Sequence, residues 1–219
     1  MTTLQIKQLG YQIDQQWLWQ GLNFTLHEND WVTIIGQSGG GKSTLLKVLA
    51  ALQDAETGDI LLDGVAISDI PVGEYRQRVS YAAQSAQLFG QTVRENLDLP
   101  FTVRQLTPDE DRQIAGLEQM QLDASYLDKA VTELSGGQRQ RIGVLRNLLF
   151  MPKVLLLDEI STGLDAETKA VIWAYIRQLQ AETHPIILSV THDEGEIAQA
   201  NQVFVLEHGQ GGFQDDRSN

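Results

Sequence analysis

A short glycine-rich segment constrains the fold of this chain more than any other feature of its sequence. Residues 36–44 have the spacing Gly-x-x-x-x-Gly-Lys-Ser, which is typical of a phosphate-binding loop. A β-branched run at 31–35 precedes the segment, and apolar residues at helical spacing follow it over 42–53. This order predicts a strand, a phosphate loop and a helix. The alternative is a glycine-rich turn with a solvated lysine.

The residue types in this loop suit the binding of a nucleoside triphosphate. Glycines allow backbone N–H groups to converge on phosphates, and the N-terminus of the following helix adds positive potential. Lys42 can reach the β- and γ-phosphate oxygens, and Ser43 can ligate magnesium. The predicted loop comprises Gly36, Gln37, Ser38, Gly39, Gly40, Gly41, Lys42, Ser43 and Thr44.

Composition argues against several other classes of protein. Acidic residues outnumber basic ones by 29 to 16, and the formal net charge of -13 disfavours nonspecific binding to nucleic acid or to an anionic bilayer. The absence of cysteine excludes disulfides, thiolate zinc sites and iron–sulfur clusters. The 4 histidines are scattered, so no transition metal held by protein ligands is expected. No apolar run approaches the length of a membrane span, and we expect a soluble chain.

Hydrophobic periodicity divides the chain into β and helical regions within one domain, 1–219. Leu22, Phe24 and Leu26 alternate with polar residues, so residues 1–35 are predicted to form a hairpin-rich β region. A helical pattern over 105–150, with Thr107 as the expected cap, indicates a helical subdomain of about 86–150 inserted into the core. The polar, glycine-rich tail at 208–219 is expected to be frayed.

A hydrophobic run at 154–157 ends in two carboxylates, Asp158 and Glu159. Together with the run at 186–188 and the helical pattern between them, it predicts buried parallel strands joined by a crossover helix. Ligands bind beyond the carboxyl ends of such strands. We therefore assign Asp158 to the magnesium shell and Glu159 to the activation of the attacking water. A solvated strand end is the alternative.

A second anion-binding segment is predicted at 134–138. Its residues Ser135, Gly136, Gly137 and Gln138 open a predicted helix, and a helix N-terminus with a serine hydroxyl can bind a γ-phosphate. Because the loop at 36–44 already provides one cradle, the second is expected to serve a nucleotide held by another copy of the chain. This predicts a two-fold, head-to-tail dimer. An ordinary capped helix is the alternative.

With these motifs in this order, nearly the whole sequence resembles an ABC ATPase subunit. The resemblance rests also on Gln84, on the run at 161–165 and on Thr191-His192. It implies an α/β fold: a P-loop NTPase core with a mixed sheet, an N-terminal antiparallel β subdomain and a helical insertion. It implies further that Gln84 joins the magnesium and water network, that His192 contacts the γ-phosphate and that Asp165 communicates across the dimer.

Two further positions are interpreted through the same resemblance. Tyr11, 25 residues before Gly36, matches the aromatic residue that stacks on adenine in this family. Trp17 or Trp19 could supply the ring instead, and hairpin packing is the alternative for all of these rings. The sequence departs from the common family form at Thr162-Gly163, where Ser-Ala usually precedes Leu-Asp, and a glycine adds backbone freedom there.

Segments at 75–81, 87–93 and 146–154 resemble the FetA type of ATP-binding subunit, which is associated with iron export and is paired with a separate membrane subunit of the FetB type. The stretch 88–96 also resembles the coupling surface of drug and lipid exporters. The resemblance implies an ATPase that uses ATP and Mg2+ and powers transport through a membrane-spanning permease. We expect a homodimer with ATP sandwiched between protomers, cytoplasmic and peripheral on the inner face of the cell membrane.

Two other functions compete with this interpretation. A soluble ABC ATPase could use the same ATP-bound dimer to act on nucleic acid or ribosomes. Such proteins commonly carry a second cassette, long coiled coils or basic arms, and this sequence has none of these features. A regulatory module could bind nucleotide without turnover, and Glu159 and His192 argue against that alternative.

Overall fold

The computed structural model describes residues 1–214 and divides them into two compact units. The first unit contains residues 1–81, 153–159 and 185–214, and the second contains residues 82–152 and 160–184. The segment 86–150, which the sequence assigns to an inserted helical subdomain, lies within the second unit. Residues 160–184 belong to that unit as well.

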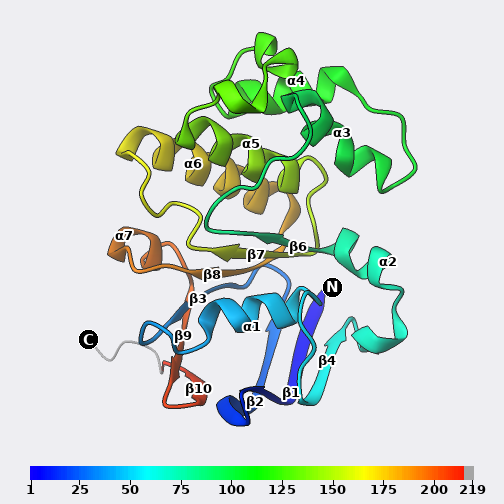
Figure 1. The fold of residues 1–219 in the computed structure, drawn as a ribbon. Coiled ribbons are helices and arrows are strands. Elements are labelled where there is room, and N and C mark those ends of the chain that lie inside the picture. The colour runs from blue at the N-terminus through cyan, green and yellow to red at the C-terminus, as the bar shows by residue number, and fades with distance from the viewer. Residues whose placement is uncertain (215–219) are drawn as a thin grey trace. The chain divides into compact units, whose positions relative to one another are not determined.

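The first unit begins with an antiparallel sheet (Figure 1). Its strands, in the spatial order β2-β1-β4-β5, are β1 (Thr3–Ile13), β2 (Gln16–His27), β4 (Thr57–Leu62) and β5 (Val65–Ala66). β1 and β2 form a hairpin in which Leu4 pairs with Leu26 and Ile6 with Phe24. The β region predicted at the start of the chain is confirmed, because alternating apolar residues place one face of each strand in the core.

A mixed sheet contains the remaining strands of the described chain. In the spatial order β10-β9-β3-β8-β7-β6, it comprises β3 (Trp31–Ile35), β6 (Val79–Ala82), β7 (Val154–Asp158), β8 (Ile186–Val190), β9 (Gln202–Glu207) and β10 (Gln210–Phe213). β8 is parallel to both β3 and β7, whereas β10 is antiparallel to β9. The predicted parallel strands at 154–157 and 186–188 are therefore confirmed, and α6 (Ala166–Thr183) lies between them in the chain.

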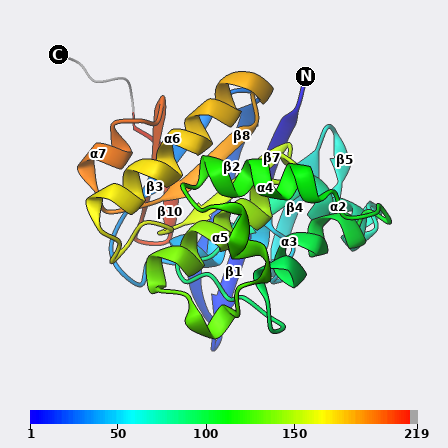
Figure 2. The same ribbon diagram turned by 90° about the horizontal axis from the view of Figure 1, so that it is seen from above.

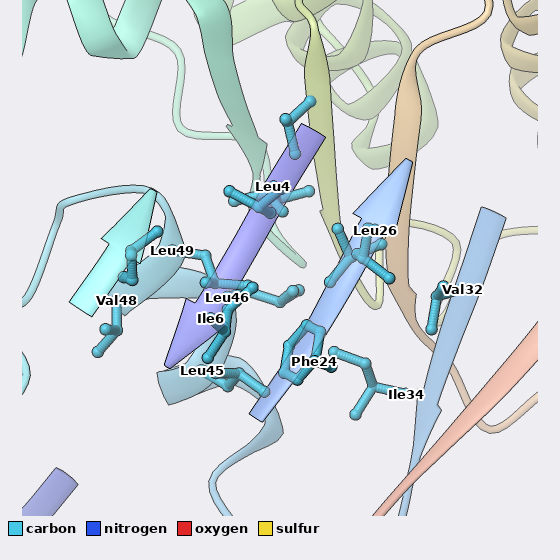
Figure 3. Close-up of a cluster of buried hydrophobic side chains, with 14 of the residues drawn as sticks. Leu4, Ile6, Phe24, Leu26, Val32, Ile34, Leu45, Leu46, Val48 and Leu49 are labelled. Carbon is cyan, nitrogen blue, oxygen red and sulfur yellow. The ribbon is translucent and has the colours of Figure 1, made fainter. Parts of the chain in front are cut away.

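Apolar side chains from β1, β2, β3 and helix α1 (Lys42–Leu49) form a core (Figure 3). The core includes Leu4, Ile6, Phe24, Leu26, Val32, Ile34, Leu45, Leu46, Val48 and Leu49. Burial of each such side chain contributes about 1.5–3 kcal/mol relative to exposure. Because β3 and α1 are both anchored in this core, the glycine loop that joins them is held at a defined position.

Helix α1 is shorter than the predicted range of 42–53. It ends at Leu49, and Ala51 has a left-handed backbone with φ of 52°. Since the helical hydrogen-bonding pattern cannot continue through this conformation, the chain turns and Leu52 remains 47% exposed. Leu52 fits the helical spacing but does not belong to the core.

The second unit is mainly helical. It contains α3 (Val93–Thr102), α4 (Glu110–Gln119), α5 (Gly136–Leu148) and α6, together with the short helices η2 (Ala124–Asp128) and η3 (Val131–Glu133). Helix α5 contacts α3, α4 and α6 (Figure 2). The predicted cap at Thr107 is wrong: Asp109 caps α4, and its Oδ1 accepts a hydrogen bond from Arg112 N at 3.1 Å. A carboxylate at this position also interacts favourably with the helix dipole.

The expectation of a frayed tail is wrong for residues 210–213, which form β10. The Phe213 ring lies 5.3 Å from the ring of Phe204 and 6.2 Å from that of Phe24, so aromatic packing holds the strand. Residues 215–219 of the tail lie outside the described residues. The shorter helices of the first unit are η1 (Ile67–Asp69), α2 (Val72–Arg78) and α7 (Glu194–Ile197). Within residues 1–214, no helix has the length and apolar character required to cross a membrane.

Candidate functional site

The loop between β3 and α1 depends on glycine where it enters the helix. Gly41 caps α1 with φ of 86°, a left-handed conformation that side chains other than glycine adopt at a cost. A Cβ atom there would lie 2.5 Å from Leu18 Cδ2 and 2.8 Å from Trp19 Nε1. The loop therefore packs directly on β2, and only glycine fits at its last position.

The start of α1 is suited to an anion. No side chain caps this helix, and no acidic residue lies in its first turn. Backbone N–H groups at such a terminus are available to phosphate oxygens. The Lys42 ammonium donates to the carbonyl oxygens of Gly36 at 2.8 Å and Gln37 at 2.9 Å, so it lies within the loop. Burial lowers the pKa of Lys42, and the charges of Glu159 and Asp158 oppose that shift.

Asp158 stands at the carboxyl end of β7 and is 5% exposed. The Ser43 hydroxyl donates to Asp158 Oδ1 at 2.8 Å, and the Tyr81 hydroxyl donates to Asp158 Oδ2 at 2.6 Å. Burial, followed by the hydrogen bond to Asp158, raises the pKa of the Tyr81 phenol. Sequence reasoning assigned no role to Tyr81. The pattern that could have revealed it is its place on the strand that directly precedes Gln84.

Glu159 follows in a strained backbone conformation, with φ of 50°. Its N–H group donates to the carbonyl oxygen of Val190 at 2.9 Å, which ties the turn after β7 to the end of β8. His192 Nε2 lies 3.5 Å from Glu159 Oε1. The structure thus brings together the two side chains that the sequence places 33 positions apart, at 159 and 192.

Hydrogen bonds of Thr191 stabilise the turn that carries His192. The Thr191 hydroxyl donates to Glu196 Oε2 at 2.6 Å and accepts a hydrogen bond from Asp193 N at 3.1 Å. Glu196, on α7, is 5% exposed. Sequence reasoning missed Glu196. Because both neighbours of His192 are held by this network, the imidazole is presented outward with 58% of its side chain exposed.

The aromatic residues of the hairpin have different environments. Trp19 is 0% exposed, and its Nε1 donates to the Gly41 carbonyl oxygen at 3.3 Å. Trp19 is therefore a core residue that supports the phosphate loop, not a platform for a base. The Tyr11 ring lies 5.7 Å from the Trp19 ring and is half-buried, whereas Trp17 is 40% exposed.

The remaining predicted site residues belong to the second unit. Ser135 Oγ accepts from Gln138 N at 3.2 Å, and Gln138 Oε1 accepts from Ser135 N at 3.0 Å, so the start of α5 has a capping box. Ser135 and Gly136 are exposed, and a Cβ added at Gly136 would meet no atom within 4 Å. Gly137 is half-buried. Space therefore remains at this helix N-terminus.

Asp165 caps α6 and accepts hydrogen bonds from Thr168 N at 2.8 Å and from Thr168 Oγ1 at 2.9 Å. These bonds lower the pKa of Asp165. The nearby Gly163, which departs from the common family form, has φ of 76°. Glycine suits this left-handed turn, so the substitution matches the local backbone.

Gln84 is exposed and lies two residues beyond β6, at the start of the second unit. The segment around Gln84 is hydrogen-bonded to Gln140, a buried residue of α5 that sequence reasoning missed. Gln140 Oε1 accepts from Ala86 N at 2.9 Å, and Gln140 Nε2 donates to the carbonyl oxygens of Ala83 at 3.4 Å and Ile160 at 2.8 Å. A polar residue at a core position of α5 is the sequence signal for this link.

Replacing Gln140 by Leu is expected to destabilise the protein by about 3 kcal/mol, because three backbone groups lose a buried partner. Urea unfolding monitored by circular dichroism measures the change. Gln178→Leu is the matched control, because Gln178 is exposed on α6, where its Nε2 donates to Glu182 Oε1 at 3.0 Å. Equal stability of the two variants would contradict a structural role for Gln140.

Comparisons with known proteins establish the family of this chain. Residues 19–162 match the family described as ABC transporter. The chain belongs to the ABC transporter family. It is 42% identical over 214 residues to the Probable iron export ATP-binding protein FetA of Escherichia coli (strain K12), a match that covers 98% of this chain and 95% of that protein.

The fold has a close counterpart among solved structures. A bacterial Atm1-family ABC exporter with ATP bound matches with a TM-score of 0.83 and 25% identity over 96% of this chain. The chain spans 39% of the length of that exporter chain. These comparisons confirm the predicted P-loop fold and its function: this ABC protein is a nucleotide-binding ATPase subunit of a transporter.

Proposed function

We propose that two copies of this ABC ATPase bind two ATP molecules between them and that hydrolysis drives a separate membrane-spanning export subunit. The observation that carries the proposal is the single site formed by Lys42, Ser43, Asp158 and Glu159. Ser43 is hydrogen-bonded to Asp158, and the charges of both carboxylates act on Lys42. Phosphoryl transfer depends mainly on positioning and charge neutralisation, which these groups supply.

Magnesium fits this site. Ser43 Oγ and Asp158 Oδ1, 2.8 Å apart, are the hard oxygen donors that magnesium prefers, and they would hold the ion. Within residues 1–214 no cluster of His, Asp and Glu forms a complete metal site, so phosphate and water would provide the other ligands. When bound, magnesium neutralises charge on the β- and γ-phosphates. Lys42 and the loop N–H groups orient the same phosphates.

Glu159 is the proposed base that orients and deprotonates the attacking water. His192, whose Nε2 lies 3.5 Å from the Glu159 carboxylate, would contact the γ-phosphate. We assign Gln84 to the same network of magnesium and water, where it would report the γ-phosphate to the transport partner. Between Tyr11 and Trp19, Tyr11 is the proposed residue that stacks on adenine, because Trp19 is buried and its Nε1 donates a hydrogen bond to the phosphate loop.

The second cradle supports a head-to-tail dimer. The start of α5 combines an exposed Ser135, open space at Gly136 and no acidic residue in the first turn. The loop at 36–44 already serves one nucleotide within the same chain. We propose that Ser135, Gly136, Gly137 and Gln138 close the nucleotide site of a second copy and that Asp165 communicates across that interface.

The transport partner is proposed to be a membrane-spanning permease of the FetB type, which would place the ATPase on the inner face of the cell membrane. The exported substrate is proposed to be iron or a related metal, because the relative of 42% identity is named for iron export. The surface at 84–96 is the proposed contact with the permease. Copurification of a tagged copy from native membranes would test the partner.

Mixing two inactive variants tests the composite site. Lys42→Ala removes the phosphate-binding ammonium, and Gly136→Asp places a carboxylate in the second cradle. The Asp side chain meets no atom within 4 Å at its Cβ and lies at a helix N-terminus, so the fold should be retained. An equal mixture contains half heterodimers, each with one intact site, and should regain about a quarter of the parental ATPase rate if the sites act independently.

The control is a mixture of Lys42→Ala with a variant that carries both substitutions, which leaves no intact site in any dimer. Phosphate release and circular dichroism are measured for every sample. An inactive mixture of two folded single variants would contradict the shared site.

A further inference from the structure

We propose that Tyr81 is a positioning residue for the carboxylate of Asp158, and that it sets the affinity of this ATPase for its divalent cation. The inference deepens the proposed function, because it rests on the assignment of Asp158 as a magnesium ligand. Tyr81 belongs to β6, which neighbours β7 in the mixed sheet, and Asp158 is the last residue of β7.

Each oxygen of the Asp158 carboxylate has its own hydroxyl donor. Ser43 Oγ donates to Oδ1 at 2.8 Å, and the Tyr81 phenol donates to Oδ2 at 2.6 Å. Two donors on opposite oxygens fix the rotation of the carboxylate about its last torsion.

The two hydroxyl donors differ in their relation to the cation. Ser43 Oγ is itself a proposed ligand, which presents a lone pair to the ion while its O–H group remains available to donate to Oδ1. The bond from Tyr81 to Oδ2 involves neither of the two atoms assigned to the metal, Ser43 Oγ and Asp158 Oδ1, so it can persist when the cation binds. Tyr81 therefore keeps Asp158 oriented during ligation, in the way that partners of metal-binding carboxylates generally do.

Tyr81→Phe removes only the hydroxyl and keeps the ring. We expect the affinity for Mn2+, measured by electron paramagnetic resonance in the presence of a non-hydrolysable ATP analogue, to fall about 10-fold. Binding of the same analogue in excess EDTA should not change. The turnover rate at saturating Mg2+ should recover to within about twofold of the parent, because the lost interaction acts on cation affinity and not on the reacting atoms.

The matched control is Tyr75→Phe. Tyr75 is buried, whereas Tyr81 is partly buried, and Tyr75 also donates a hydrogen bond of 2.6 Å, but its acceptor is the carbonyl oxygen of Leu49. This variant should keep the parental Mn2+ affinity, so a loss confined to Tyr81→Phe separates positioning of Asp158 from general loss of a buried hydroxyl. Thermal unfolding of both variants verifies the fold.

Asp158→Asn, measured in the same assay, separates failure of this inference from failure of the proposed function. Parental Mn2+ affinity in Asp158→Asn would overturn the assignment of Asp158 as a ligand, and the inference with it. Weak binding in Asp158→Asn together with parental binding in Tyr81→Phe would overturn only the role of Tyr81.

Discussion

Glu159→Gln is expected to lower steady-state ATP turnover by about 100- to 1000-fold, because an amide cannot accept the proton of the attacking water. ATP binding should be preserved, since the phosphate contacts proposed for Lys42 and the start of α1 do not involve Glu159. The amide is isosteric with the carboxylate, so the strained turn at Glu159, with φ of 50°, is retained. Phosphate release measures turnover, and binding of a fluorescent ATP analogue measures affinity.

The control for this change is Glu118→Gln. Glu118 is exposed on α4 and is not among the residues assigned to the nucleotide site, so this variant tests the loss of one negative charge by itself. Its turnover should equal that of the parent. A Glu159→Gln variant that hydrolyses ATP at the parental rate would exclude Glu159 as the base. ATP should also hold Glu159→Gln as a dimer in gel filtration, because hydrolysis would no longer release the two copies.

Gly41→Ala is expected to destabilise the protein by about 3 kcal/mol, from the sum of left-handed backbone strain and overpacking. The added Cβ would lie 2.5 Å from Leu18 Cδ2 and 2.8 Å from Trp19 Nε1, so the loop or the hairpin must shift. Because Trp19 and Gly41 are hydrogen-bonded, either movement disturbs the start of α1. We expect ATP affinity to fall at least about 100-fold through loss of the converging N–H groups.

Gly64→Ala is the control that separates left-handed backbone strain from steric overlap of the added Cβ. Gly64 has φ of 81°, close to the value at Gly41, but a Cβ there would meet no atom within 4 Å. The Gly64→Ala substitution should lower the free energy of unfolding by about 1 kcal/mol through backbone strain alone, and it should leave ATP affinity unchanged. Urea unfolding and ATP titration are measured for both variants. If Gly41→Ala binds ATP as tightly as Gly64→Ala does, the packing of the loop on β2 is not required for nucleotide binding.

Local patterns in the sequence predicted most of the elements but not their ends. The helix after the phosphate loop was correctly placed, yet its end at Leu49 depends on the left-handed backbone at Ala51, which no periodicity reports. Glycine and polar residues dominate 208–219, and this composition predicts a frayed tail. Pairing with β9 and packing of Phe213 on Phe204 stabilise residues 210–213 instead.

The choice among the hairpin aromatics also required the fold. Tyr11, Trp17 and Trp19 lie within nine positions, and by residue type alone any of the three rings could stack on adenine. Trp17 and Trp19 are two positions apart and would share one face of a regular strand, yet Trp19 is buried in the core, whereas Trp17, near the turn between β1 and β2, is 40% exposed. The bond from Trp19 to Gly41 then links the hairpin to the phosphate loop, a connection that spans 22 residues of sequence.

The sequence by itself determined the family, and it located the phosphate-loop motif and the two carboxylates proposed for catalysis, because these depend on residue types at fixed spacing within short segments. Only the tertiary structure decided which side chains support them. The bond from Tyr81 to Asp158 spans 77 residues and exists because β6 and β7 are neighbours in the sheet. The bonds of Gln140 to Ala86 and Ile160 span 54 and 20 residues. Such contacts are set by strand order and helix packing, which bring distant residues within the 3 Å range of a hydrogen bond.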